Sequence, residues 1–236
     1  MEISVKNKRV TLFCSMPIQF NEELIKVYVN EFSPKDLIPT VNKGMGLKIT
    51  PKGLIAEDVI SLELKKLDDS RRVVFSSDRI DIESNQTDDS MEDFLLFAKD
   101  IKQVLSSKMN ISFVRLALCE SVVFTISDSQ RIEAYRTIVN KEEAIPVEWQ
   151  FQNVRRSKIT AVNQTTCDVT INEVYNVKSP ETSDVGIMIL DMDINTKVGA
   201  TVEQIDAVEP LFWSYANGKI SNTIDSYKLR LGNVDE

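Results

Sequence analysis

The order of predicted strands and helices occurs twice along this chain of 236 residues. Residues 1–109 read as a strand, a helix, two or three strands and a long amphipathic helix, and residues 110–236 follow the same order. The repetition lies in the architecture, because the two segments share no sequence repeat. Two such units can join their strands in one antiparallel sheet with the helices on one side. We therefore predict an α+β fold, an antiparallel sheet packed against helices, with two pseudo-repeated β-α-β-β-β-α halves, 1–109 and 110–236, in one continuous domain.

Two long helices are predicted from the spacing of apolar residues. In the C-terminal helix, Thr201 and Gln204 form a capping-box pattern at the start. Pro210 and Gly218 interrupt the apolar stripe of this helix, which predicts a kink or a break near one of them. The other helix covers residues 91–108, and its apolar side chains recur at three- and four-residue spacings that define one face: Phe94, Phe97, Ala98, Ile101, Val104 and Leu105.

Apolar and β-branched segments predict the strands. Residues 111–126 read as one long strand or as two strands joined at Glu120–Ser121. Residues 185–194 are almost wholly apolar, which is typical of a central strand buried on both faces. Residues 21–32 fit either a helix or an alternating strand, and we favour the helix. The Gly44-Met45-Gly46 segment is predicted to turn the chain into the strands that follow.

The chain contains no histidine, and this absence constrains its chemistry more than any motif does. Imidazole is the commonest general acid or base and a common zinc ligand, so histidine triads and histidine-ligated zinc hydrolysis are excluded. Carboxylate–metal chemistry remains, or no catalysis at all. Cys14, Cys119 and Cys167 form no C-x-x-C pair, and we interpret them as buried, reduced thiols of a protein in a reducing cytoplasm.

The net charge of −8 argues against broad binding to nucleic acid, which needs a cationic surface, and against docking on anionic lipid. A local basic patch is still compatible with this total. No segment has the roughly 18 consecutive apolar residues of a membrane span. The N-terminus also lacks the apolar stretch of a signal peptide. These features predict a cytoplasmic protein that has no membrane partner.

Asp191 and Asp193 are the candidate metal ligands. Residues two apart on a strand point to the same face, so these two carboxylates could hold one Mg²⁺ or Mn²⁺. Asp81 and Glu83 repeat the pattern on the strand that we expect to be equivalent in the first half. The alternative is structural, with the acids facing solvent or paired with a nearby arginine.

Arg155, Arg156 and Lys158 are the candidate nucleic-acid contacts. They follow Trp149 and Phe151 in the sequence, and aromatic residues interleaved with basic ones can stack bases and hold phosphates. The alternative is that the aromatic residues belong to the core and the basic residues to the solvated end of a hairpin.

Trp213 is the candidate partner contact. In the C-terminal helix, Phe212 and Tyr215 can both serve the core stripe, whereas Trp213 lies about 100° around the helix from Phe212. An exposed tryptophan is a typical anchor of protein interfaces. The open alternative is a second buried contact within the chain.

Two short motifs carry a resemblance to a known family. Arg115-Leu116-Ala117-Leu118 lies on one predicted strand, and Leu190-Asp191-Met192-Asp193 lies on another, which precedes the C-terminal helix. These features resemble a sporadically distributed family of uncharacterised bacterial proteins of similar length. Family members commonly follow the first motif with Arg-Tyr, where this chain has Cys119-Glu120. The resemblance implies no catalytic residue, and the patchy distribution of the family is like that of accessory genes in phage-defence and toxin–antitoxin loci.

The function that we predict from the sequence is that of a non-enzymatic interaction or regulatory protein, or of a complex subunit. It would work with another protein, as a homo- or hetero-oligomer and without a cofactor, in a phage-defence or toxin–antitoxin setting. The missing histidine and the lack of a complete catalytic constellation favour this prediction. One alternative is a nuclease or phosphotransferase that uses Asp191 and Asp193 with Mg²⁺ or Mn²⁺. Another is a nucleic-acid-sensing accessory protein.

Overall fold

The structure is a computed structural model, and it describes most of the chain. The described residues are 2–20, 22–50, 53–86, 89–139, 146–162, 166–180 and 186–232. None of the helices in these ranges is long and apolar enough to cross a membrane.

The described residues form nine strands and four α-helices. A 3₁₀ turn, η1 (Ser33–Lys35), follows the first helix. In chain order the elements are β1 (Glu2–Cys14), α1 (Glu22–Phe32), β2 (Ile38–Thr50), β3 (Gly53–Lys65), β4 (Arg71–Phe75), β5 (Arg79–Ser84), α2 (Met91–Met109), β6 (Phe113–Ile126), α3 (Asp128–Ile138), β7 (Trp149–Val162), β8 (Thr166–Ser179), β9 (Gly186–Thr196) and α4 (Val202–Gly232).

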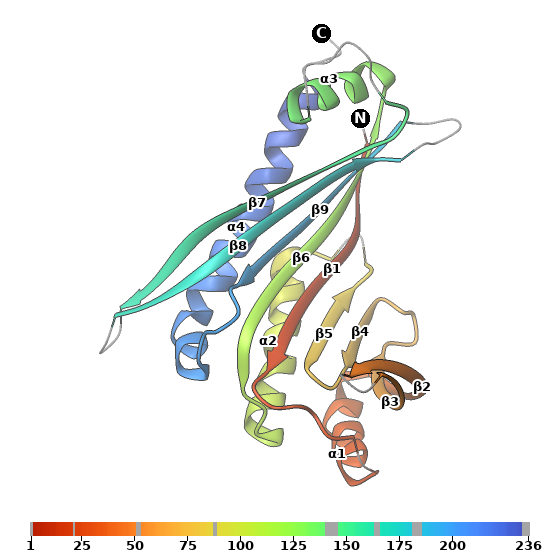
Figure 1. Cartoon of the computed structure of the whole chain (residues 1–236), viewed down its shortest axis with the longest axis vertical. Helices are drawn as coiled ribbons and strands as arrows, with labels where there is room; N and C mark the ends of the chain where they lie inside the picture. Colours follow the sequence, from red (N-terminus) through yellow and green to blue (C-terminus); the bar gives the residue numbers. More distant parts are fainter. Residues whose placement is uncertain are drawn as a thin grey trace.

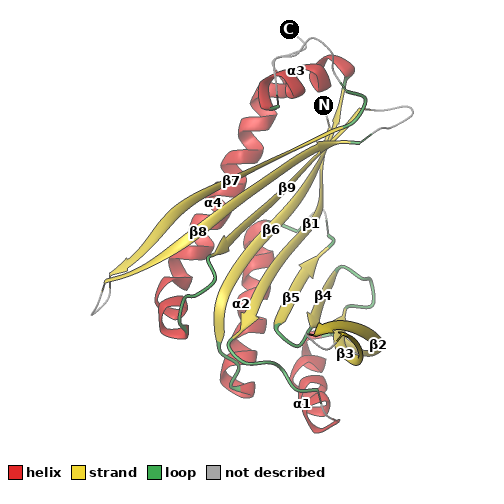
Figure 2. Cartoon of the chain, viewed as in Figure 1, coloured by secondary structure: helices red, strands yellow, loops and turns green. Residues whose placement is uncertain are grey.

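The nine strands form one sheet in the order β2-β3-β4-β5-β1-β6-β9-β8-β7. All neighbouring strands are antiparallel. Helices α2 and α4 lie on one face of this sheet (Figures 1 and 2). Helix α1 packs on the same side, where the rings of Tyr28 and Phe75 have centroids 4.7 Å apart. The predicted α+β fold, an antiparallel sheet packed against helices, is therefore confirmed.

The two predicted halves meet at the centre of the sheet. β1 opens the first half and β6 opens the second, and these two strands pair along their whole length. β5 lies beside β1, and β9 lies beside β6, so each half places its last strand next to its first. The first half has one strand more than the second. The additional strand arises because the chain turns back between Phe75 and Arg79, where the amide of Ser76 donates to the carbonyl of Arg79 at 2.9 Å.

Local start signals predicted the helices well. Residues 22–32 are helical, as favoured, and β6 is one continuous strand. The predicted capping box at the start of α4 is present, because the amide of Gln204 donates to Thr201 Oγ1 at 3.3 Å and the amide of Thr201 donates to Gln204 Oε1 at 2.9 Å. Such caps involve residues only three apart, so no long-range contact is needed to specify them.

Three local predictions are wrong. Gly44-Met45-Gly46 lies inside β2 instead of forming a turn. α4 is a single helix of 31 residues that runs through Pro210 and Gly218 without a break. One backbone hydrogen bond lost at Pro210 is outweighed by the burial of neighbouring apolar side chains, such as Phe212. β9 is covered by helices on one face only, so Asp191 and its neighbours on the other face are half-buried.

The side chains of each strand alternate between two different environments. On the helix-covered face, apolar residues from β1, β5, β6 and β9 form the core with α2 and α4. The opposite face, which we call the open face, carries mainly polar and charged side chains. Because the side-chain period of a strand is two, neighbouring residues in a strand lie on different faces. This alternation decides which predicted site residues can come together.

Candidate functional site

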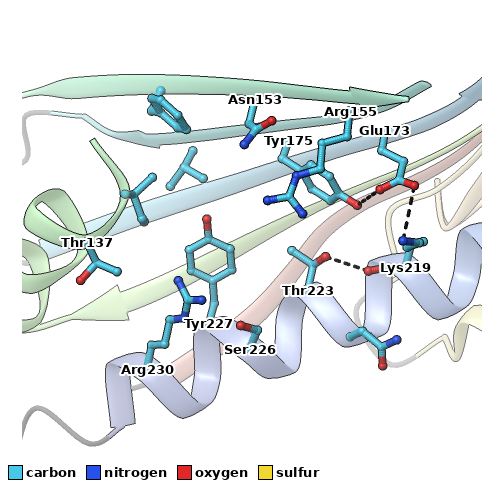
Figure 3. Close-up of a pocket in the computed structure, with 14 residues that line it drawn as sticks. Thr137, Asn153, Arg155, Glu173, Tyr175, Lys219, Thr223, Ser226, Tyr227 and Arg230 are labelled. Atoms are coloured by element: carbon cyan, nitrogen blue, oxygen red, sulfur yellow. Dashed lines mark hydrogen bonds and ion pairs between the residues drawn. The ribbon is translucent and has the colours of Figure 1, made fainter. Parts of the chain in front are cut away.

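A cleft lies between α4 and the β7–β8 hairpin, and the end of α3 contributes to one side of it (Figure 3). Its volume is about 490 Å³. Pockets that hold small molecules usually have volumes of roughly 300–1,000 Å³. Only three of its fourteen lining residues are apolar: Ile138, Phe151 and Val177. The cleft is therefore large enough for a small molecule, and its lining favours a polar one.

The sheet wall of the cleft consists of successive residue pairs on β7 and β8. Arg155 lies opposite Glu173, and two residues along each strand Asn153 lies opposite Tyr175. The next inward-facing pair is Phe151 with Val177. Each step along this ladder covers about 6.8 Å. Over about 14 Å, the wall therefore passes from a charged pair to a pair with an amide and a phenol, and then to an apolar pair.

The helix wall comes from one face of α4. Lys219, Thr223, Ser226, Tyr227 and Arg230 recur at spacings of three and four residues, which places them on the same side of the helix. Tyr227 also rests on the sheet, where its ring centroid lies 6.3 Å from that of Phe124. Packing of this kind fixes the rotation of α4, so the polar side chains are directed toward β7 and β8.

Glu173 is the centre of a group of side chains in the cleft wall that are joined by hydrogen bonds and an ion pair. It is only 3 % exposed. Its carboxylate accepts hydrogen bonds from Ser157 at 2.9 Å, from Tyr175 at 3.0 Å and from Tyr215, and it pairs with Lys219 at 3.4 Å. Burial by itself would raise the pKa of Glu173, but these hydrogen bonds and the lysine charge outweigh it and hold the pKa below its ordinary value. Glu173 is therefore an anion at neutral pH.

The tyrosines around Glu173 remain protonated. Burial, together with the neighbouring carboxylate, raises the pKa of Tyr175 to about 12. The same two causes raise the pKa of Tyr215. Ser157 lies 2.6 Å from the Tyr215 hydroxyl and also donates to Glu173. Because the carboxylate is saturated and neither phenol is a base at neutral pH, this group stiffens the cleft wall and does not activate Ser157 as a nucleophile.

Arg155 and Arg230 give the cleft its charge. Figure 3 shows their guanidinium groups turned toward the side chain of Tyr227. Burial raises the pKa of Tyr227, and the charges of Arg230 and Arg155 act in the opposite direction, which places both cations near this phenol. Within the described ranges, neither arginine has an ion pair or a hydrogen bond. Since Lys219 and Glu173 neutralise each other, the described residues leave two uncompensated positive charges in the cleft.

The candidate metal ligands lie elsewhere, on the open face of β9. Asp191 accepts hydrogen bonds from Ser121 at 2.6 Å and from Lys178 at 2.8 Å. Asp193 accepts from the Asn195 amide at 3.0 Å. No group of three or more histidine, cysteine, aspartate and glutamate side chains that could hold a metal ion occurs in the part of the chain that the structure describes. Asp191 is therefore held by a lysine and a serine, and Asp193 by an amide, on the open face.

The candidate nucleic-acid contacts are divided between the two faces of the sheet. Arg155 points into the cleft, whereas Arg156 and Lys158 lie on the open face because of the two-residue alternation. Their partners across the hairpin are Asn172 and Thr170. The three residues therefore do not form one continuous surface, and only Arg155 belongs to the cleft.

Trp213 does not present a surface to a partner. It is 3 % exposed, and its ring lies edge-on to Phe212 with a centroid distance of 4.9 Å. Its indole nitrogen donates to Glu209 at 3.1 Å, and Glu209 pairs with Lys102 of α2. The prediction of an exposed interface anchor is therefore wrong. The buried face of α4 is wide enough to include Trp213, because α2 packs beside α4.

Two important cleft residues were not singled out from the sequence. Glu173 and Arg230 lie outside every motif that the sequence pattern indicated as a candidate site. The polar residues from Lys219 to Arg230 do recur at helical spacing, which could have indicated a second, functional face of this helix. Nothing in the local sequence links that face to β8.

The motifs that carry the family resemblance lie side by side in the sheet, because β6 pairs with β9. Arg115 donates from Nε to the carbonyl of Thr196 at 3.0 Å, so it ties the two motif strands together. Cys119 lies directly opposite Asp193. Neither a known family model nor a curated protein matches this chain. The resemblance therefore remains an expectation from the motifs alone.

Proposed function

We propose that the protein is a non-enzymatic ligand-binding protein, acting as a regulator or complex subunit, and that the cleft binds a phosphorylated small molecule. The observation that carries this proposal is the pair Arg155 and Arg230. The two guanidinium groups approach one phenol from different elements, and neither forms an ion pair with a described carboxylate.

A phosphate monoester fits the charge of this site. Such a group carries a charge of about −1.5 to −2 at neutral pH, which matches the two cations left after Lys219 and Glu173 are paired. Guanidinium groups bind phosphate oxygens in a fork geometry with two parallel hydrogen bonds. The hydroxyl groups of Ser226 and Tyr227 lie on the same wall and can donate further bonds.

The saturated state of Glu173 supports binding over catalysis. A general base needs a free lone pair and a pKa near the working pH. Glu173 has neither, since it is held ionised by four donors. The site therefore has the cations to hold a phosphate and no described group prepared to attack it.

Calorimetry with two small probes tests this proposal. We expect ribose 5-phosphate to bind and ribose to show no heat above its dilution. The double variant Arg155→Gln and Arg230→Gln should bind at least about 10-fold more weakly, since hydrogen bonds to charged groups contribute about 1.5–3 kcal/mol each.

A matched control removes the same charge from the other face. The double variant Arg156→Gln and Lys158→Gln lowers the net charge by the same two units but leaves the cleft intact. We expect it to bind ribose 5-phosphate as the unmodified protein does. Equal weakening by both double variants, or no binding by the unmodified protein, would refute the proposal.

A further inference from the structure

We infer that the ligand of the cleft is a nucleoside monophosphate, with its base packed against Phe151 and its phosphate between Arg155 and Arg230. This inference rests on the proposed phosphate site and adds the chemical class of the group attached to the phosphate. The observation behind it is the change of character along the sheet wall.

Phe151 gives the cleft a flat apolar surface at the end near α3. It lies opposite Val177 on β8, and Ile138 at the end of α3 lies beside the same part of the cleft. The Phe151 side chain is half-buried, so part of its ring faces the cleft. Bases stack on aromatic rings regardless of their sequence identity because every base has a π-face. A sugar phosphate without a base would leave this apolar end in contact with water.

Asn153 lies between Phe151 and Arg155 on the sheet wall of the cleft. Its side chain lines the cleft, opposite Tyr175. No hydrogen bond joins its side-chain amide to another described residue. A primary amide offers both donors and an acceptor, which is what recognition of the polar edge of a base requires. The residue is therefore placed one ladder step, about 7 Å, from Phe151, where it can contact a base edge or a ribose hydroxyl.

The order of these groups matches the order of groups in a mononucleotide. Phe151, Asn153 and Arg155 follow each other along the sheet wall, as base, sugar and phosphate do in the ligand, and Arg230 joins Arg155 from the helix wall. Glu173 lies directly opposite Arg155, but its charge is paired with Lys219 and bound by three hydroxyl donors, so it repels the phosphate less than a free carboxylate would. The helix wall supplies hydroxyl groups along the same length, from Thr223 to Tyr227.

A ligand panel with the full-length protein tests this inference. The probes are AMP, GMP, CMP, UMP, ribose 5-phosphate and inorganic phosphate, each titrated by calorimetry. We expect at least one nucleotide to bind about 10-fold or more tightly than ribose 5-phosphate, which is the usual effect of one stacked base. The variant Phe151→Leu should lower nucleotide affinity to the level of ribose 5-phosphate and leave the affinity for ribose 5-phosphate unchanged.

Two further variants make the outcome unambiguous. Asn153→Ser should reduce the differences among the four nucleotides, whereas Gln152→Ser, on the opposite face of β7, should not change them. If ribose 5-phosphate and all nucleotides bind equally, or if Phe151→Leu keeps the preference, the inference fails while the phosphate-binding function stands. If neither ribose 5-phosphate nor any nucleotide binds, the proposed function fails as well.

Discussion

The acidic residues of the open face and the two arginines of the cleft differ in how far their charges are paired. On the open face, Asp81 accepts hydrogen bonds from Thr11 at 2.6 Å and from Arg79 at 3.0 Å. In the cleft, Arg155 and Arg230 have no partner of this kind among the described residues. A fully paired network stabilises a fold, whereas unpaired charges that converge on a cavity are available to a ligand.

A sequence pattern shows which residues are charged, but it does not show whether each charge is paired in the fold. Acidic pairs on a strand, such as Asp191 with Asp193, are prominent in the sequence. In the fold, Asp191 is held by Lys178 and Ser121 and contributes to the sheet surface. The presence of charged residues is therefore a weaker indicator of a site than the absence of their partners.

The largest loss of stability is expected when the carboxylate of Glu173, which accepts several hydrogen bonds in the cleft wall, is removed. Replacing Glu173 by alanine leaves the half-buried hydroxyls of Ser157, Tyr175 and Tyr215 without this acceptor. We expect the free energy of unfolding to fall by about 2–4 kcal/mol, measured by urea denaturation. Asp168→Ala on the exposed side of the same strand is the control, with an expected change of about 0.5 kcal/mol or less. Equal losses in the two variants would contradict the central role of Glu173.

The same carboxylate predicts how stability depends on pH. Its folded pKa lies below the ordinary value of 4.5, so its contribution is present above that pH and is lost as the pH falls through the folded pKa. On the alkaline side, the pKa of Tyr175 is raised from 10.0 to about 12, so stability should decrease as the pH rises from 10 toward 12. Denaturation curves of the Glu173→Gln variant should show a weaker dependence on acid than those of the unmodified protein. An unchanged acid dependence would show that other groups control it.

A moderate effect is expected from breaking the paired network of the open face. Asp81 is 8 % exposed, and Asp81→Asn removes the charge that holds Arg79. We expect a loss of about 1–2 kcal/mol in the free energy of unfolding and no change in the affinity for ribose 5-phosphate. A change in that affinity would mean that the open face and the cleft are energetically coupled.

The smallest effect is expected at the candidate metal ligand. The Lys178–Asp191 pair is partly exposed, with side-chain exposures of 37 % and 32 %. Asp191→Asn should therefore change the free energy of unfolding by less than about 1 kcal/mol. A loss several times larger would show that Asp191 has a role beyond this surface pair, and calorimetry with Mg²⁺ and Mn²⁺ on both proteins would then reveal whether that role is metal binding.

Local patterns were sufficient for much of the fold. The apolar spacing of residues 91–108 and the capping signal at Thr201 placed α2 and the start of α4 close to their observed positions. These features depend on residues within one or two turns of each other, so the sequence contains all the information they need. The repeated order of elements likewise predicted that the strands of both halves join one antiparallel sheet.

The sequence by itself determined the class of the fold, the ends of most helices and the exclusion of histidine-based chemistry. Only the tertiary structure decided which side chains share a site. Arg155 and Arg156 are neighbours in the chain, yet they lie on opposite faces, because the register of β7 and β8 sets the direction of each side chain. Arg230 reaches the cleft only because α4 packs across β7 and β8. Contacts of this kind join residues that are far apart in the sequence, and their geometry follows from packing of the whole sheet rather than from any local pattern.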